Sequence, residues 1–245
     1  MTHPIDSTPP AAFSYPLAHP FALLFDLDGT LAETAPDLCA AMNHVLLLNG
    51  LQPVPTEQLR DMIGGGARMI LQRGLAHNKT EWDDERLDMA TEELVAYYDA
   101  HICDQTYLYD GVLDCLSAAK TSKIGCAVVT NKRFGLAKHL LAELGIEDFF
   151  DVIIGGDTLP TRKPDPAMLE AAAAHLGTPI ENCIMIGDSE ADTGAAKAAG
   201  IASICVDFGY RNVPADQLGA DQLISSYQEI YAAIESCLPG LKLKI

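Results

Sequence analysis

Short apolar runs bounded by turn residues recur along the chain and predict strands buried in a sheet. They cover residues 21–25, 124–129, 152–154, 183–186 and 203–206. From residue 124 onward the runs alternate with helical stretches at 134–144, 166–176 and 192–199, and each stretch is followed by a glycine that can end a helix. This alternation predicts an α/β fold: a doubly wound, Rossmann-like parallel sheet that binds ligands beyond the carboxyl ends of its strands.

The stretch between the first two predicted strands breaks this alternation. Residues 33–107 contain no convincing strand, and their apolar residues recur at helical spacing, as in Leu38, Met42, Val45 and Leu46. We therefore expect a helical cap of about four helices, inserted into a core formed by residues 20–32 and 108–245. Connections near 32–36 and 103–110 would join the two. Residues 1–19 are rich in proline without a basic start or an apolar stretch, which predicts a loose tail rather than a signal peptide.

Composition narrows the possible partners. The 245 residues are 49% hydrophobic, with a formal net charge of -18, which argues against binding to nucleic acid or anionic lipid. No apolar run reaches the roughly 18 residues that a membrane helix needs. Seven scattered cysteines without metal-ligand spacing indicate reduced thiols and a cytoplasmic protein, whose oligomeric state the sequence leaves open. A site for an anion must gather the few cations locally, and the candidates are Lys132, Arg133, Arg162 and Lys163.

Carboxylates follow two of the predicted strands. Asp26 and Asp28 come directly after the first strand, in Phe-Asp-Leu-Asp-Gly-Thr, and residues two apart on a strand point to the same side. Asp188 follows a later apolar run and adds another oxygen at the same edge of the sheet. A small set of oxygen ligands favours Mg²⁺ as the cofactor. Asp192 stands three residues after Ser189, as in a capping box, so it either supports the site or caps a helix.

Two further groups suit an anion at this edge. Thr130 follows the second strand together with Asn131, and its hydroxyl can donate to a phosphate oxygen. Lys163 lies in Arg-Lys-Pro-Asp-Pro, where the prolines restrict the backbone and hold the ammonium in one place.

These motifs together resemble the haloacid dehalogenase superfamily, from about residue 21 to the end and including the helical cap. The matching residues are Asp26-x-Asp28-Gly29-Thr30, Thr130, Lys163 and Gly187-Asp188-x-x-x-Asp192. The resemblance implies a phosphatase in which Asp26 is the nucleophile and Asp28 the general acid and base. It implies that Thr130 and Lys163 stabilise the transferring phosphoryl group. It also implies that Mg²⁺ is held by Asp26, the backbone carbonyl of Asp28 and Asp188, with Asp192 in support.

Within that superfamily the chain resembles phosphoglycolate phosphatases. The similar stretches are residues 64–68, 130–132, 155–160, 162–164 and 208–210. The resemblance implies 2-phosphoglycolate as the substrate, with Gly29, Asn131, Gly66 and Arg68 as substrate-binding residues. A guanidinium at Arg68 can form a two-pronged contact with a carboxylate, although Arg68 can equally be a surface helix residue. The chain departs from the family at Glu33-Thr34, where Asp-Ser is common, and at Asp165, where His is frequent.

Several alternatives stay open at this point. A phosphatase for a sugar phosphate or a phosphomutase would use the same core motifs. A phosphoacceptor signalling module also combines acids, Thr and Lys, but it carries its acceptor after a later strand and has no helical insert. Asp28 disfavours a dehalogenase, because displacing halide needs no acid for the leaving group. A phosphonatase needs a Schiff-base lysine in the cap, where Lys79 is the single lysine.

Overall fold

The core of the molecule is a parallel sheet of six strands. The computed structural model describes residues 19–55, 58, 60–211, 213–241 and 243. The strands are β1 (Ala22–Phe25), β4 (Gly125–Val129), β5 (Val152–Ile154), β6 (Cys183–Gly187), β7 (Ala202–Val206) and β8 (Gln222–Ile224), in the order β5-β4-β1-β6-β7-β8. Neighbouring strands all pair in parallel. This confirms the predicted doubly wound α/β fold, and β8 is a strand that the prediction missed.

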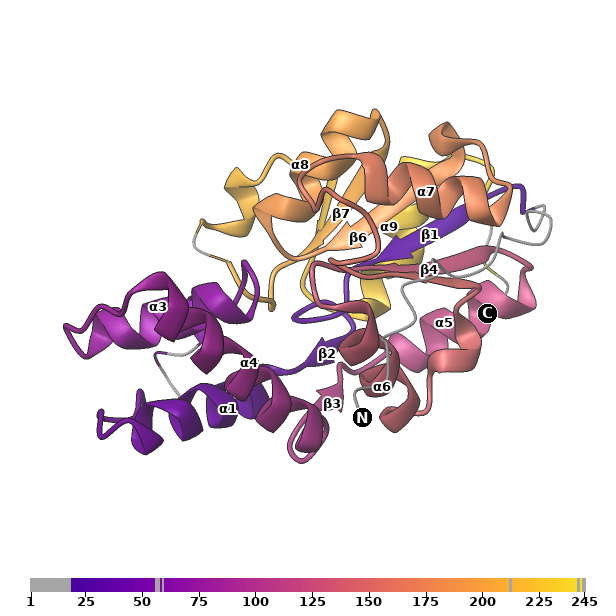
Figure 1. Ribbon diagram of the computed structural model, residues 1–245. Coiled ribbons are helices and arrows are strands. Elements are labelled where there is room, and N and C mark those ends of the chain that lie inside the picture. Colours follow the sequence, from indigo (N-terminus) through magenta and orange to yellow (C-terminus); the bar gives the residue numbers. More distant parts are fainter. Residues whose placement is uncertain (1–18, 56–57, 59, 212, 242, 244–245) are drawn as a thin grey trace.

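Helices cover both faces of the sheet, as Figure 1 shows. One face carries α7 (Ala167–Leu176) and α8 (Glu190–Ala199), and the other carries α5 (Val112–Thr121), α6 (Phe134–Glu143) and α9 (Ile230–Cys237). Successive residues of β1 alternate between the two faces: Leu24 packs under α7, and Phe25 packs on the opposite side. The prediction included α6, α7 and α8 but not α5 or α9.

The helices of the predicted cap form a separate group beside the sheet (Figure 1). They are α1 (Ala35–Leu48), the 3₁₀ turn η1 (Arg60–Met62), α3 (Ala67–His77) and α4 (Asp84–Ala100). Their apolar stripes face one another, with Met42, Val45, Leu71 and Leu94 buried between them. The helical character agrees with the apolar spacing, while the exact boundaries of the two domains stay a prediction.

A short antiparallel ribbon joins this helical group to the core, which the sequence did not predict. It consists of β2 (Ala32–Glu33) and β3 (Tyr107–Leu108), and Glu33 is the register partner of Tyr107. Strands of two residues have no alternation that a pattern of apolar positions can reveal. Both connections between cap and core therefore run side by side.

The predicted N-terminal tail lies almost wholly outside the described residues, which begin at His19. Among the described residues, none of the helices has the length and apolar character that crossing a membrane requires.

Candidate active site

Asp26 and Asp188 lie at the carboxyl ends of neighbouring strands. The chain runs from β1 outward to β4 and β5 on one side and continues with β6 on the other, so the strand order reverses between β1 and β6. Open parallel sheets bind ligands at such a reversal. The N–H of Asp26 donates to the carbonyl of Ile186 at 2.9 Å, which joins the two strand ends. Next to them lies a cavity of about 690 Å³, lined by the core and by the cap helices.

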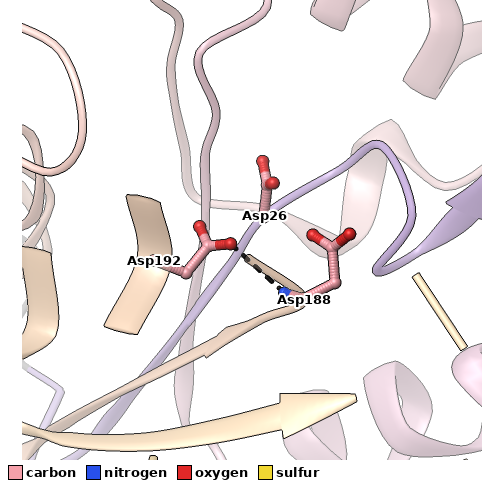
Figure 2. A group of neighbouring side chains, drawn as sticks. All are labelled: Asp26, Asp188 and Asp192. Atoms are coloured by element: carbon pink, nitrogen blue, oxygen red, sulfur yellow. Dashed lines mark hydrogen bonds between the residues drawn. The ribbon is translucent and has the colours of Figure 1, made fainter. Parts of the chain in front are cut away.

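Three carboxylates gather at this point, as Figure 2 shows. Asp26, Asp188 and Asp192 have oxygens that lie within 4.8 Å of one another. Burial raises the pKa of Asp26 to about 6, against the attraction of Lys163 and with repulsion from Asp192. Burial raises the pKa of Asp188 as well, and repulsion from Asp192 and Asp26 adds to it. Acids this close ionise together only when a cation neutralises them, so the cluster fits a divalent metal ion.

Asp192 contacts three residues through its two carboxylate oxygens. Its Oδ2 accepts from the N–H groups of Asp188 at 3.2 Å and Ser189 at 3.1 Å, and from the Ser189 hydroxyl at 2.7 Å. Its Oδ1 accepts from the ammonium of Lys163 at 2.6 Å. The sequence left open whether Asp192 caps a helix or supports the site, and in the structure it makes both sets of contacts. Asp26 and Asp188 have fewer contacts and so more oxygen available for a metal: Asp26 Oδ1 faces the Lys163 ammonium at 3.1 Å, and Asp188 accepts from the Thr30 hydroxyl at 3.3 Å and from the N–H of Tyr210.

Lys163 reaches the nucleophile that the sequence predicted. Its Nζ lies 3.1 Å from Asp26 Oδ1, and its side chain is 1% exposed. Asn131 fixes the backbone of Lys163, because Asn131 Oδ1 accepts from the Lys163 N–H and Asn131 Nδ2 donates to the Lys163 carbonyl, both at 3.0 Å. The Asn131 amide thus positions the lysine; the contact with substrate that the sequence predicted for Asn131 stays a prediction.

Thr130 and Gly29 complete the predicted core site. Thr130 follows β4 and is buried, and its Oγ1 accepts from the N–H of Lys132 at 3.2 Å, which leaves the hydroxyl hydrogen to donate elsewhere. Gly29 has a positive φ of 79°, and a Cβ there would lie 2.6 Å from Asp188 Oδ2. The structure thus explains glycine at this position by its close approach to Asp188. Contact between Gly29 and substrate stays a prediction.

Asp28 has a partner that the sequence did not assign. The Lys132 ammonium donates to Asp28 Oδ1 at 2.7 Å and to the Tyr98 hydroxyl of α4 at 2.9 Å. It also lies 4.5 Å from the centre of the Tyr98 ring. Lys132 was one of the four cations considered for an anion site, but nothing in the sequence pairs it with Asp28. Through Tyr98 this ion pair connects the core to the cap.

Tyr210 is a second contact that sequence reasoning missed. Its backbone N–H donates to Asp188 Oδ2. Its hydroxyl oxygen accepts from the N–H groups of Thr34 at 2.7 Å and Ala35 at 2.9 Å, at the start of α1, and donates to Glu33. The Tyr210 hydroxyl therefore caps the N-terminus of α1, whose own N-cap residue makes no side-chain hydrogen bond to the helix. The only signal in the sequence was the family-like stretch 208–210.

The two predicted cap residues lie at the cavity. Gly66 precedes α3 with a φ of 89°. The Arg68 guanidinium pairs with Asp84 at 2.5 Å and with Asp88 at 2.8 Å, both on α4. A substrate contact of either residue stays a prediction.

Comparison with known proteins agrees with this geometry. The family model of haloacid dehalogenase-like hydrolases matches residues 23–206. The phosphoglycolate phosphatase of Caulobacter vibrioides is 38% identical over 208 residues, covering 85% of this chain and 88% of that protein. The one from Neisseria meningitidis is 38% identical over 224 residues, covering 89% and 95%.

Solved structures show the same fold. A predicted phosphoglycolate phosphatase from Haemophilus somnus superposes with a TM-score of 0.81 at 29% identity, covering 86% of this chain and 96% of that one. CbbY from Rhodobacter sphaeroides, in complex with phosphate, gives a TM-score of 0.74 at 28% identity, covering 85% and 95%. The resemblance predicted from the motifs is confirmed, and with it the class of enzyme, a phosphoric monoester hydrolase. The chain belongs to the haloacid dehalogenase-like hydrolases, and within that family it is similar to phosphoglycolate phosphatases.

Proposed function

We propose that the protein is a Mg²⁺-dependent phosphatase that hydrolyses 2-phosphoglycolate through an aspartyl-phosphate on Asp26. One observation carries this proposal: Asp26 lies at a strand end, 3.1 Å from the buried ammonium of Lys163, and lines the same cavity as Asp28, Thr130 and Asp188. A carboxylate nucleophile, a potential proton donor and groups for the phosphoryl oxygens thus share one enclosed space.

In the first half of the reaction, an oxygen of Asp26 attacks phosphorus and the bond from phosphorus to the ester oxygen breaks. The departing alkoxide takes a proton from the Asp28 carboxyl. Lys163 and the Thr130 hydroxyl hold the phosphoryl oxygens, whose charge they stabilise as the bonds change. Asp192 and Asn131 keep Lys163 in place for this, through its ammonium and its backbone respectively.

In the second half, water attacks phosphorus of the acyl phosphate. Asp28, now ionised, takes a proton from that water, and the Asp26 carboxylate is regained as inorganic phosphate leaves. The same residue therefore gives and takes one proton per turnover.

The carboxylates of Asp26 and Asp188, together with the backbone carbonyl of Asp28, would hold Mg²⁺. When bound, the ion supplies positive charge that neutralises the crowded acids and the phosphoryl oxygens. Two tests of this cofactor can be made with any phosphate ester that the enzyme hydrolyses. EDTA should abolish phosphate release and Mg²⁺ should restore it, while Ca²⁺ should bind but support little turnover, because its looser coordination misplaces the reacting atoms.

The substrate assignment rests on similarity to named phosphoglycolate phosphatases. Together with the net charge of -18, it also supports a small-molecule partner in the cytoplasm rather than nucleic acid or membrane. Phosphate release should be measured against a panel of 2-phosphoglycolate, sugar phosphates and p-nitrophenyl phosphate. A preference for a sugar phosphate would show that the substrate is a sugar phosphate and not 2-phosphoglycolate. Conversion of a sugar phosphate to its isomer would indicate a phosphomutase.

The nucleophile has its own test within the same assay. Asp26→Asn should lower kcat by more than about 100-fold, a loss above ~2.7 kcal/mol, without unfolding the protein. Retention of more than about a hundredth of the wild-type rate would exclude covalent catalysis by Asp26. Trapping of ³²P on the wild-type protein, and its absence from the variant, would identify the intermediate directly.

A further inference from the structure

The charged side chains of the cavity pair with one another almost completely. Five carboxylates and five cationic groups line it. On the core side, Lys163 pairs with Asp26 at 3.1 Å, and Lys132 pairs with Asp28 at 2.7 Å. Both pairs belong to the phosphoryl-transfer machinery described above.

The cap side of the cavity contains two further pairs. Arg68 lies 2.8 Å from Asp88, and it also reaches Asp84. Arg133 binds Glu92 through both terminal nitrogens, at 2.5 and 2.9 Å. A substrate carboxylate that recruited either arginine would have to share a guanidinium whose charge a carboxylate of the cap already neutralises.

Two charged groups of the cavity are left over among the described residues. Asp188 makes no ion pair, and it is one of the proposed metal ligands. Arg162 is the remaining cation, and none of its nitrogens forms an ion pair with a described carboxylate. The cavity therefore has one carboxylate outside any ion pair, which is available to a metal ion, and one cation outside any ion pair, which is available to an anion.

Arg162 is held so that its free nitrogens face the cap. Its Nε donates to the carbonyl of Gly156 at 2.6 Å, which fixes one edge of the guanidinium. Its Nη1 lies 3.9 Å from the position that a Cβ on Gly66 would occupy, so the group lies next to the glycine turn at 64–66. Its backbone is continuous with Lys163, whose N–H is fixed by Asn131. Lys163 and Arg162 thus bring one cation to the nucleophile and the next to the cap side of the same cavity.

We propose that Arg162 binds the second anionic group of the substrate, a carboxylate on the carbon chain that carries the phosphate. This rests on the proposed function and specifies which residue selects the substrate. The terminal nitrogens of the guanidinium offer two parallel N–H donors, which match the two oxygens of a carboxylate. An ester that ends in a neutral hydroxyl leaves this charge without a partner, so Arg162 separates acidic from neutral phosphate esters.

The test compares two esters that differ at the far end, 2-phosphoglycolate and 2-hydroxyethyl phosphate. Arg162→Gln should lower kcat/KM for 2-phosphoglycolate by about 10- to 100-fold and change kcat/KM for 2-hydroxyethyl phosphate by no more than about twofold. Arg162→Lys keeps the charge without the two-pronged contact and should recover part of the loss. Arg86→Gln is the matched control, since Arg86 is exposed, contacts Asn49 and Trp82, and lies away from the cavity.

A second measurement does not depend on turnover. With Mg²⁺ present, calorimetry should show that Asp26→Asn binds 2-phosphoglycolate about tenfold more tightly than the double variant Asp26→Asn/Arg162→Gln. Equal affinities of the single and the double variant for 2-phosphoglycolate would overturn the assignment. So would a loss of the preference for 2-phosphoglycolate over 2-hydroxyethyl phosphate in Arg68→Gln instead of Arg162→Gln. A wild-type protein that hydrolyses neither ester would refute the proposed function, while the binding comparison would still decide the role of Arg162.

Discussion

The ammonium of Lys132 donates a 2.7 Å hydrogen bond to the carboxylate of Asp28, and the same ammonium contacts Tyr98 of the cap. Lys132 is buried, so its removal leaves Asp28 close to Asp26 without a neutralising partner. We expect Lys132→Met to lower kcat/KM by about 100-fold or more. Tyr98→Phe keeps the ring against the ammonium and removes one hydrogen bond, so it should cost only about fivefold. Steady-state kinetics of the two variants would show whether the ion pair or the contact with the cap matters more; equal losses would contradict this ranking.

Asp28→Asn tests the acid that the mechanism assigns. A poor leaving group needs a proton and a good one does not, so the loss in kcat/KM should be about 100- to 1,000-fold for an alkyl phosphate and about tenfold less for p-nitrophenyl phosphate. Both substrates are measured with the same enzyme preparation, so differences in folding cancel. Equal losses would remove Asp28 from the role of acid.

Gly29→Ala tests the proposed metal site through its packing. A Cβ at position 29 would lie 2.6 Å from Asp188 Oδ2, whereas at Gly50, with a similar φ of 70°, it would meet nothing within 4 Å. Both variants strain a left-handed backbone, but only one displaces Asp188. The Mg²⁺ concentration for half-maximal activity should rise about tenfold or more in Gly29→Ala and stay near the wild-type value in Gly50→Ala. A similar rise in both would show that backbone strain, and not Asp188, is responsible.

The stability of the metal-free protein should depend on pH through the same acids. Burial raises the pKa of Asp26 from its ordinary 3.8 to about 6 and raises the pKa of Asp188 too, so the folded state binds these protons more tightly than the unfolded state. The contribution of Asp26 to stability is then complete below pH 3.8 and is lost as the pH rises through 6, and the contribution of Asp188 changes in the same direction. In EDTA, Tm should fall as the pH rises through this range, and the fall should be smaller in Asp26→Asn. In the control variant Asp216→Asn, at an exposed residue, the fall in Tm should equal that of the wild type.

Mg²⁺ should reverse this loss. The ion binds the ionised carboxylates, so the rise in Tm on adding Mg²⁺ should be larger at pH 7.5 than at pH 5. Scanning calorimetry at both values, with and without EDTA, measures the difference. A Tm increase that does not depend on pH would contradict metal binding by the buried acids.

The sheet and the acids of the site were predictable because their signals are local. Apolar runs gave five of the strands, and acids directly after β1 and β6 had to meet where those strands end. The sequence also contains a local signal for helix α5, because its buried residues Val112, Cys115, Leu116 and Ala119 recur at helical spacing.

Other contacts had no local signal. Tyr210 reaches the N–H of Thr34 across 176 positions of sequence, and Lys132 reaches Asp28 across 104. Such pairs depend on how loops from different strands converge, which neither propensity nor spacing encodes. The contact between Asp192 and Lys163 is another such pair. The sequence shows the spacing of Asp192 from Ser189, but it does not show that the ammonium of Lys163 lies beside Asp192.

The pairing of Glu33 with Tyr107 makes the cap, in topological terms, a very long hairpin loop. The chain leaves the core and returns to it one strand spacing away, a gap that a turn of about two residues can close. Changes in the length of the cap therefore need not move β1 or Asp26, and the entropy of loop closure grows only slowly with length. The segment between these two residues can thus vary in length while the core, which carries Asp26, Lys163 and Arg162, keeps its geometry.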